Sequence, residues 1–89
     1  MTHRTFGRFW DYYGELPLSV QELADKNYDL LKIDPYHPSL HFKKLNKKGR
    51  ILWSVRIGSG YRAIGREREE GIIAWFWIGT HAEYDRLIS

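Results

Sequence analysis

Apolar residues follow two different periods along the chain, and the change falls near its middle. Four aromatic residues near the start recur at helical spacing: Phe6, Phe9, Trp10 and Tyr13. This spacing predicts a short amphipathic helix over about residues 5–14, which Pro17 ends. Ser19, as N-cap, and Glu22, as its capping-box partner, then predict a second helix that continues to Pro35. The first part of the chain is therefore expected to form a helical hairpin.

The second part of the chain alternates between short apolar segments and turn sequences. The turns are "NKKG", "GSG" and "EEG", and the segments between them have the period of two that is typical of strands. Four strands are predicted: residues 40–45, 51–57, 61–67 and 72–78. Because short connections join successive strands, we expect an antiparallel meander.

Alternation along these segments gives the predicted sheet two different faces. In "ILWSVRI" the odd-numbered positions are apolar and should pack on the helices, whereas Ser54 and Arg56 point the other way with Leu52. In "YRAIGR", Arg62 shares a face with Ile64. Arg56 and Arg62 flank the same tight turn, so we expect them to lie near each other on the polar face.

The last predicted strand, "IIAWFWI", is apolar on both faces, so it should be central in the sheet or covered on both sides. Trp75 and Trp77 are two residues apart and are predicted to share one face within the core. "THAEYDRLI" then predicts a short C-terminal helix with Thr80 as N-cap. The predicted fold is a single α+β domain over residues 1–89: a helical hairpin packed on a four-stranded antiparallel sheet, followed by a short C-terminal helix.

Composition places the chain among small globular proteins. Its 89 residues leave room for one core, and 43% of them are hydrophobic, which argues against a disordered chain. There is no cysteine, which excludes disulfides and thiolate zinc sites and fits a reducing cytoplasm. No apolar run approaches the roughly 18 residues of a membrane span, and the N-terminus has no signal-peptide pattern. We expect a cytoplasmic protein without a membrane partner.

Charge is concentrated in one part of the sequence. Residues 40–68 hold nine Lys or Arg residues and one acidic residue, a net charge of +8, although the whole chain carries only +3. The basic residues of this segment are Lys43, Lys44, Lys47, Lys48, Arg50, Arg56, Arg62, Arg66 and Arg68. Such a segment favours binding to phosphate or to an acidic protein, and the alternative is an ordinary solvated surface.

Three motifs resemble the RelE/ParE superfamily of bacterial type II toxins: "LPLSVQELADKNYDLLKIDPYHPSLHFKKL", "LWSVRIGSGYRAIG" and "WFWIGTHAEYDRLI". Together they span about residues 16–88. The resemblance implies one of two activities: RelE-like members cut mRNA in the ribosomal A site, and ParE-like members poison DNA gyrase without nuclease activity. It also implies an antitoxin that silences the toxin.

One segment departs from the superfamily pattern. Its members usually begin with a β-strand before the helical hairpin. Here "MTHRTFGRFW" is short and shows no clear alternation of apolar and polar residues. We therefore expect the first strand to be reduced or absent.

RNA cleavage without a metal defines which side chains to look for. The 2′-hydroxyl attacks the neighbouring phosphate, which needs a base for that hydroxyl, a cation for the charge on phosphorus and an acid for the leaving 5′-oxygen. Arg56 and Arg62 suit the phosphate, because a guanidinium stays charged and can hold two phosphate oxygens. The resemblance also implies a catalytic role for both. The alternative is a pair of surface arginines that bind the acidic antitoxin.

His81 and Tyr84 are the other two candidate catalytic residues. They follow the last strand and are three residues apart, so on a helix they share a face and can converge on one substrate. Histidine can give or take a proton near neutral pH, and tyrosine can stack on a base or donate its hydroxyl. RelE-like enzymes often have such residues here. The alternative is a capping histidine and a tyrosine packed under the sheet.

The segment "HFKKLNKKGR", residues 41–50, predicts a basic strand and turn that bind RNA. Its side chains would follow an RNA backbone by charge, with little reading of sequence. The candidate RNA-binding residues are Lys43, Lys44, Lys47, Lys48 and Arg50, and the alternative is ordinary solvated side chains. His37 and His41 have no acidic or cysteine companion nearby, so a connector role is expected instead of a metal site. No metal or other cofactor is expected.

The sequence therefore favours a RelE-like toxin that acts as a ribosome-dependent, metal-independent mRNA endoribonuclease. Its expected partners are a cognate acidic antitoxin, the ribosome and mRNA. Two alternatives stay open. One is a ParE-like protein that inhibits DNA gyrase without cutting RNA, and the other is a degenerate toxin that only binds its antitoxin.

Overall fold

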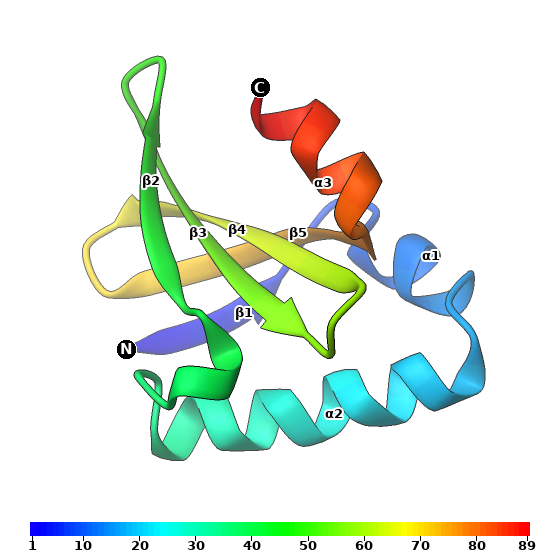
Figure 1. Ribbon diagram of the computed structural model, residues 1–89. Helices are drawn as coiled ribbons and strands as arrows, with labels where there is room; N and C mark the ends of the chain where they lie inside the picture. Colours follow the sequence, from blue (N-terminus) through cyan, green and yellow to red (C-terminus); the bar gives the residue numbers. More distant parts are fainter.

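Three α-helices flank a five-stranded mixed sheet in the computed structural model, which describes residues 1–89 (Figure 1). In chain order the elements are β1 (Thr2–Thr5), α1 (Phe9–Gly14), α2 (Leu18–Ile33), a 3₁₀ turn (Pro38–Leu40), β2 (Lys43–Lys47), β3 (Arg50–Ile57), β4 (Tyr61–Glu69), β5 (Ile72–Thr80) and α3 (His81–Ile88). The strand order is β1-β5-β4-β3-β2, with β1 parallel to β5 and the other pairs antiparallel. Helices α1 and α2 pack on one face of the sheet and α3 packs on the other (Figure 1). None of the helices is long and apolar enough to cross a membrane.

The first strand, expected to be reduced or absent, is present. The sheet therefore has five strands of mixed direction, not the four antiparallel strands that were predicted. β1 pairs with β5 from Thr2, opposite Ile72, to Thr5, opposite Trp75. Three of its four side chains are exposed, because β1 lies at the edge of the sheet and is held through its backbone. An exposed edge strand of this length has no apolar alternation by which a sequence could reveal it.

Helix α1 forms, but it is shorter than predicted. It begins only at Phe9, because Thr5 still belongs to β1. Gly7 then turns the chain between the strand and the helix, with a φ of 64°. A positive φ costs glycine little, since glycine has no Cβ. Trp10 was expected on the apolar face of this helix, yet its side chain is 60% exposed.

Helix α2 also forms, but the capping box predicted for Ser19 and Glu22 is absent. The helix begins at Leu18, and the N-cap residue is Pro17, with φ of −54° and ψ of 147°. The Pro17 carbonyl accepts the backbone N–H of Gln21 at 3.0 Å. Ser19 therefore lies inside the first turn and cannot cap it.

The main core lies between α2 and the sheet. Trp53, Val55 and Ile57 of β3 are buried on this side, as their alternation predicts. Leu31 enters from α2, and Phe42 stacks on Trp53 with ring centroids 4.4 Å apart. Each such buried side chain stabilises the fold by about 1.5–3 kcal/mol relative to an exposed position.

Strand β5 lies between β1 and β4 and is covered on both faces, as predicted. Trp75 and Trp77 are both buried, but they do not share a face: Trp75 packs under α2 and Trp77 packs against Tyr84 of α3. Trp77 pairs with Ile64 of β4, and Trp75 pairs with the next residue of that strand, Gly65. β5 therefore carries one extra residue, Phe76, between the two tryptophans. Such a bulge turns the following side chains to the other face of the sheet.

The face predicted to be polar carries a second, smaller core. Its buried residues are Ile64 and Trp77 of the sheet and Tyr84, which α3 packs against them. Thr80 caps α3 as predicted, because its hydroxyl accepts the backbone N–H of Glu83 at 3.2 Å. In return the Glu83 carboxylate accepts the backbone N–H of Thr80 at 3.0 Å, which lowers the pKa of Glu83. The capping box fixes the point at which α3 leaves the sheet.

Candidate active site

Arg56 and Arg62 lie directly opposite each other where β3 and β4 approach their connecting turn. This confirms the proximity predicted from the GSG turn. Residues in register on an antiparallel pair point to the same face, with Cβ atoms about 4.5–5.5 Å apart. Here that face is the one that α3 covers, and neither arginine forms a salt bridge. Two neighbouring cations without a carboxylate favour an anion between them.

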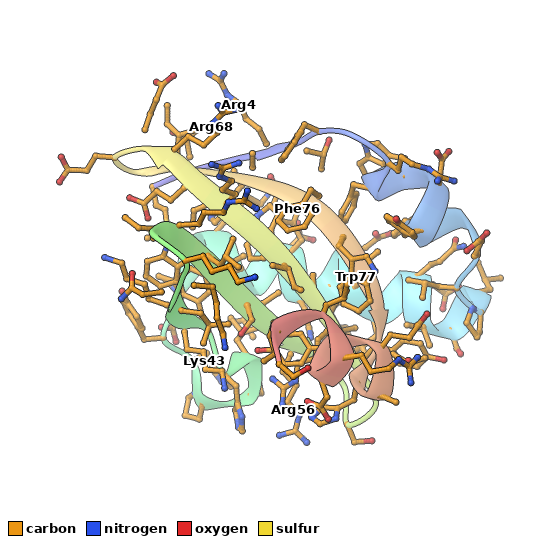
Figure 2. The ribbon with its side chains drawn as sticks, turned by 90° about the horizontal axis from the view of Figure 1, so that it is seen from above. Arg4, Lys43, Arg56, Arg68, Phe76 and Trp77 are labelled. Carbon is orange, nitrogen blue, oxygen red and sulfur yellow. The ribbon has the colours of Figure 1, made fainter.

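Two contacts hold Arg56 at the end of β3. Its Nε donates to the carbonyl of Gly58 at 2.8 Å, and its Nη1 lies 3.3 Å from Nε2 of His41. Figure 2 shows the Arg56 side chain beside α3. His41 is a site residue that the sequence missed, since it was expected only as part of a connector. The two residues are 15 positions apart, and only the pairing of β2 with β3 brings them together.

Arg62 extends beneath α3 to the ring of Tyr84. Its guanidinium carbon lies 5.3 Å from the ring centroid. The Arg62 Nε and Nη1 atoms are buried without a hydrogen-bond partner, and so are the hydroxyls of Tyr84 and Ser54. Buried polar atoms in native proteins nearly always have a partner. Arg62, Tyr84 and Ser54 all contribute these atoms on the α3 side of the sheet.

His81 and Tyr84 are neighbours on α3, with ring centroids 6.1 Å apart, but their exposures differ. His81 is exposed at the start of the helix, where its backbone N–H donates to the carbonyl of Gly60 at 2.8 Å. Tyr84 is only 3% exposed and packs on Ile64. The two rings are therefore close, as predicted from their spacing, but only His81 is open to solvent. Tyr84 lies under the helix, because an apolar cluster of the sheet extends to this point.

Asp85 is the second residue of the site that the sequence did not single out. Its Oδ2 lies 3.2 Å from Nδ1 of His81, one helical turn away. A carboxylate at Nδ1 holds the proton there and leaves Nε2 free to accept one. The spacing of four between a histidine and an aspartate on a predicted helix is the signal that could have found this pair.

The register of β2 and β3 divides the five residues predicted to bind RNA. Lys43, Lys47 and Arg50 belong to the alternating positions that point to the α3 face. Lys44 belongs to the other set and points to the α2 side. Lys48 lies in the turn between the strands, with a φ of 51°. Only three of the five therefore share a face with Arg56 and Arg62.

Basic side chains continue along the sheet toward β1. In the view of Figure 2, Arg4 and Arg68 lie toward one end of the sheet, Lys43 and Arg56 lie toward the other, and Phe76 lies between them. Arg4 lies outside the basic segment of the sequence and joins these residues because β1 pairs with β5. The basic surface is thus longer than the sequence predicted.

His37, the other histidine of the connector besides His41, has a structural role. Nδ1 of His37 accepts the backbone N–H of Ser39 at 3.2 Å and caps the 3₁₀ turn. No group of three or more His, Cys, Asp or Glu side chains is placed to hold a metal ion.

Comparison with known proteins places this arrangement among toxins. The ParE-like toxin domain family matches residues 18–86. A chain of the archaeal RelE–RelB complex from Pyrococcus horikoshii OT3 superposes with a TM-score of 0.66 and 18% identity, covering 89% of this chain and 92% of that one. The YoeB/ParE toxin from Agrobacterium tumefaciens superposes with a TM-score of 0.67 and 19% identity, covering 91% and 99%. At these identities the likeness to both structures is one of fold. No curated protein sequence matches significantly.

Proposed function

The chain belongs to the ParE-like toxin domain family, and we propose that this toxin cuts mRNA on the ribosome. The sequence motifs resembled the RelE/ParE superfamily of type II toxins, and the family match confirms that resemblance. The family includes toxins with different targets, so the proposed activity rests on the side chains of the α3 face.

The observation that carries the proposal is the pairing of Arg56 with Arg62 next to the His81–Asp85 pair. Like charges directly opposite each other on neighbouring strands destabilise a sheet unless an anion lies between them. A phosphate group has the charge and the oxygen geometry for two guanidinium forks. Both Arg62 and His81 neighbour the Tyr84 ring, so the arginines and the imidazole belong to one site.

In the proposed reaction, Arg56 and Arg62 hold oxygens of the scissile phosphate. Nε2 of His81 takes the proton of the 2′-hydroxyl, the 2′-oxygen bonds to phosphorus, and the bond from phosphorus to the 5′-oxygen breaks. The departing 5′-oxygen takes a proton from solvent, so the products are a 2′,3′-cyclic phosphate and a 5′-hydroxyl end. Asp85 orients the imidazole and balances its new charge. Proton transfer of this kind contributes about 10²–10⁴-fold to the rate.

The same basic surface suits an antitoxin. An acidic segment that lies across the α3 face would neutralise Arg56 or Arg62 and keep RNA away. The archaeal relative was solved as a RelE–RelB complex, which supports an antitoxin partner for this chain too. A complex with the partner wholly on the α1 and α2 side, leaving the α3 face open, would argue against inhibition by direct occlusion.

Inhibition of DNA gyrase without RNA cleavage is the second candidate function. The burial of Tyr84 favours it, because the exposed histidine–tyrosine pair expected of a RelE-like nuclease does not form. In that case the arginines of the α3 face would bind protein or DNA, and His81 would only begin the helix.

The test is mRNA cleavage on isolated ribosomes, with 5′-hydroxyl ends mapped along the message. His81→Ala should slow cleavage by about 10²-fold. Asp85→Asn should cost less, because the imidazole stays in place. Arg86→Gln is the matched control, since it removes an exposed charge from the same helix and should leave cleavage unchanged. Naked RNA as substrate shows whether the ribosome is required.

The decisive contrary result is a pair of measurements in cells. If His81→Ala stays fully toxic while gyrase-linked DNA breaks accumulate, the nuclease proposal is wrong and gyrase inhibition takes its place. If the wild-type chain cuts no RNA and breaks no DNA, but still binds its antitoxin, the domain is a degenerate toxin.

A further inference from the structure

His41 is an exposed residue in an unfavourable backbone conformation. It follows the 3₁₀ turn and precedes β2, with a φ of 44° and a ψ of 43°. A left-handed conformation is costly for a residue with a Cβ, and glycine or asparagine usually adopts it where a helical turn ends. Glycine would fit this backbone better, so the fold of the connector gives no reason for an imidazole at this position.

The contacts of the imidazole supply a reason, because they hold Arg56. Nη1 of Arg56 lies 3.3 Å from Nε2 of His41. A guanidinium has only donors, so Nε2 accepts this hydrogen bond, and the imidazole is neutral with its proton on Nδ1. Nε of Arg56 donates to the carbonyl of Gly58 at 2.8 Å, and Nδ2 of Asn27 in α2 donates to the Arg56 carbonyl at 3.1 Å. Both the backbone and the guanidinium of Arg56 are therefore fixed.

His41 extends the arginine pair to a row of three residues across the sheet. Lys43 lies opposite Ser54, and the same register, continued by two residues, places His41 opposite Arg56. Arg56 in turn lies opposite Arg62. A carboxylate in the place of His41 would also hold the guanidinium, but it would cancel the charge that attracts phosphate. A neutral imidazole fixes Arg56 and leaves that charge in place.

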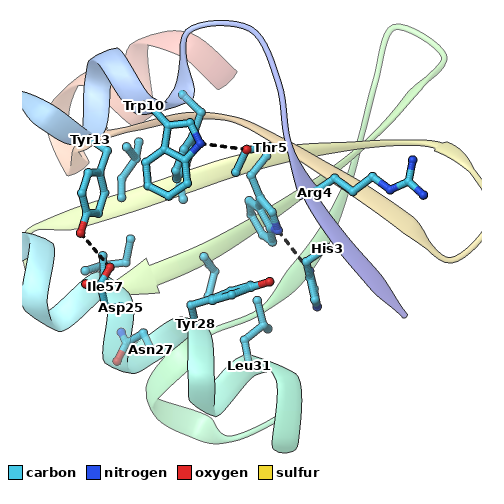
Figure 3. A pocket seen from close by; sticks show the side chains of 16 residues that line it. His3, Arg4, Thr5, Trp10, Tyr13, Asp25, Asn27, Tyr28, Leu31 and Ile57 are labelled. Carbon is cyan, nitrogen blue, oxygen red and sulfur yellow. Dashed lines mark hydrogen bonds between the residues drawn. The ribbon is translucent and has the colours of Figure 1, made fainter.

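The cavity on the opposite side of the sheet is less suited to a phosphate. It lies between α1, α2, β1 and the sheet, and its volume is about 310 Å³ (Figure 3). Most of the side chains that line it are apolar, and the carboxylate of Asp25 among them would repel an anion. Arg4 borders the cavity, but Figure 3 shows its guanidinium pointing away from it. The row on the α3 face is therefore the better place for a phosphate.

We propose that His41 is a positioning residue for RNA cleavage: its neutral Nε2 holds the Arg56 guanidinium in the orientation that meets the scissile phosphate. This role rests on the proposed nuclease function and adds a residue to it. A donor that is fixed before the substrate binds needs no reorganisation as charge develops on the phosphate. The backbone strain at His41 then accompanies this function, and loss of the imidazole should lower activity without lowering stability.

His41→Gly separates this role from a structural one. It removes the imidazole and relieves the positive φ, so the thermal midpoint should stay unchanged or rise. Single-turnover cleavage at saturating ribosome concentration should slow by about tenfold, because Arg56 is no longer held in place. The affinity for RNA should change little, since Arg56 keeps its charge. A midpoint that falls together with the rate would assign His41 a structural role and overturn the proposal.

Two other positions provide controls for this variant. Lys48 is the other residue besides glycine with a positive φ, so the midpoint of Lys48→Gly shows what relief of strain contributes alone. His37 is an exposed histidine of the same connector that does not contact Arg56. His37→Asn should leave the cleavage rate unchanged, and a tenfold loss there would overturn the assignment to His41.

A double-mutant cycle tests whether His41 acts through Arg56. Added to Arg56→Ala, His41→Gly should slow cleavage no further, since no guanidinium is left to position. The same fold loss in both backgrounds would mean that His41 acts on the substrate directly, and the proposal would be wrong. His41→Gln keeps a neutral acceptor and should recover part of the rate. A glutamine variant no faster than the glycine variant would contradict a role for hydrogen-bond acceptance.

NMR of the imidazole tests the contact without any cleavage. In alkaline solution, where the imidazole is neutral, long-range ¹H–¹⁵N correlations should place the His41 proton on Nδ1. A proton on Nε2 would overturn the proposal. The cleavage rates separate its failure from that of the nuclease function. If the wild type and His41→Gly cut RNA equally fast, only the role of His41 is wrong. If the wild type cuts no RNA, the nuclease function is wrong and the role of His41 with it.

Discussion

The guanidinium carbon of Arg62 lies 5.3 Å from the centre of the Tyr84 ring, which α3 holds against the sheet. Cation–π contacts of this kind stabilise by about 0.5–2 kcal/mol, and more as water is excluded. Because Tyr84 is only 3% exposed, we propose that it positions the arginine instead of contacting a substrate. This relationship gives Tyr84 a role that its place in the sequence did not suggest, and it can be tested by separating the ring from its hydroxyl.

Tyr84→Phe should leave the free energy of unfolding unchanged or raise it. The variant keeps the ring next to Arg62 and removes only the buried hydroxyl, which has no partner. Such an unpaired hydroxyl destabilises the folded wild-type protein by about 1–3 kcal/mol, so its removal should not lower stability. Tyr84→Ala should instead destabilise the fold by about 3–5 kcal/mol, because it leaves a cavity under α3. Urea denaturation measures both. A Tyr84→Phe protein that is stable but cuts RNA 100-fold more slowly would show that the hydroxyl takes part in the chemistry.

Arg62→Ala should slow RNA cleavage by about 10²–10³-fold, by analogy with the loss of one donor to a developing charge. Arg62→Lys should recover part of the rate, since lysine keeps the charge but not the planar fork. Arg68→Ala is the control, because Arg68 is an exposed arginine at the other end of the same strand. Single-turnover cleavage on ribosomes measures the rates. An equal loss in the control would mean that overall charge, not the Arg56–Arg62 pair, governs the reaction.

The basic residues of the β2–β3 hairpin should differ in their contribution to RNA binding according to the face they occupy. Lys43→Gln, Lys47→Gln and Arg50→Gln should each reduce the slope of log affinity against log salt by about 0.7–0.9. Lys44→Gln and Lys48→Gln should leave that slope almost unchanged. Fluorescence anisotropy of labelled RNA over a series of salt concentrations measures it. Equal effects at all five positions would show that RNA binding to the hairpin does not depend on the face that a side chain occupies.

Stability should fall as the pH drops through the titration of His3. Burial is the main cause that lowers the pKa of His3 from its ordinary value of 6.5, and the N-terminal ammonium and Lys32 add to it. Between the folded and unfolded pKa values the unfolded chain binds more protons, so unfolding becomes more favourable as pH decreases below about 6.5. Protonation also breaks the hydrogen bond from Trp75 Nε1 to Nδ1 of His3.

The measurement for His3 is the thermal midpoint between about pH 7.5 and pH 5. His3→Asn offers an acceptor that does not titrate, so it should flatten the decrease in midpoint over this range. His37→Asn changes an exposed histidine of the connector and should leave the decrease as it is in the wild type. The same slope in the wild type and in His3→Asn would assign the pH dependence to other groups.

Local patterns determined a large part of this protein. The GSG turn joins β3 to β4, so it placed Arg56 opposite Arg62, and Thr80 caps α3 through atoms three residues away. The motifs along about residues 16–88 were enough to recognise the superfamily, and the ParE-like toxin domain family matches residues 18–86. All of these features depend on residues that are close in sequence or on patterns repeated within one segment, and such features can be predicted without knowing which segments meet.

Tertiary structure decided the features that depend on distant segments. β1 exists because residues 2–5 find an open edge of β5 about 70 positions later, and four residues of which three are exposed carry no periodicity of their own. One bulge in β5 separates Trp75 from Trp77 and creates the second apolar cluster that buries Tyr84. The contact of His41 with Arg56 likewise requires two strands to pair in one register. Sequence determines which residues can form such contacts, but burial and register select among them only when the whole sheet is assembled.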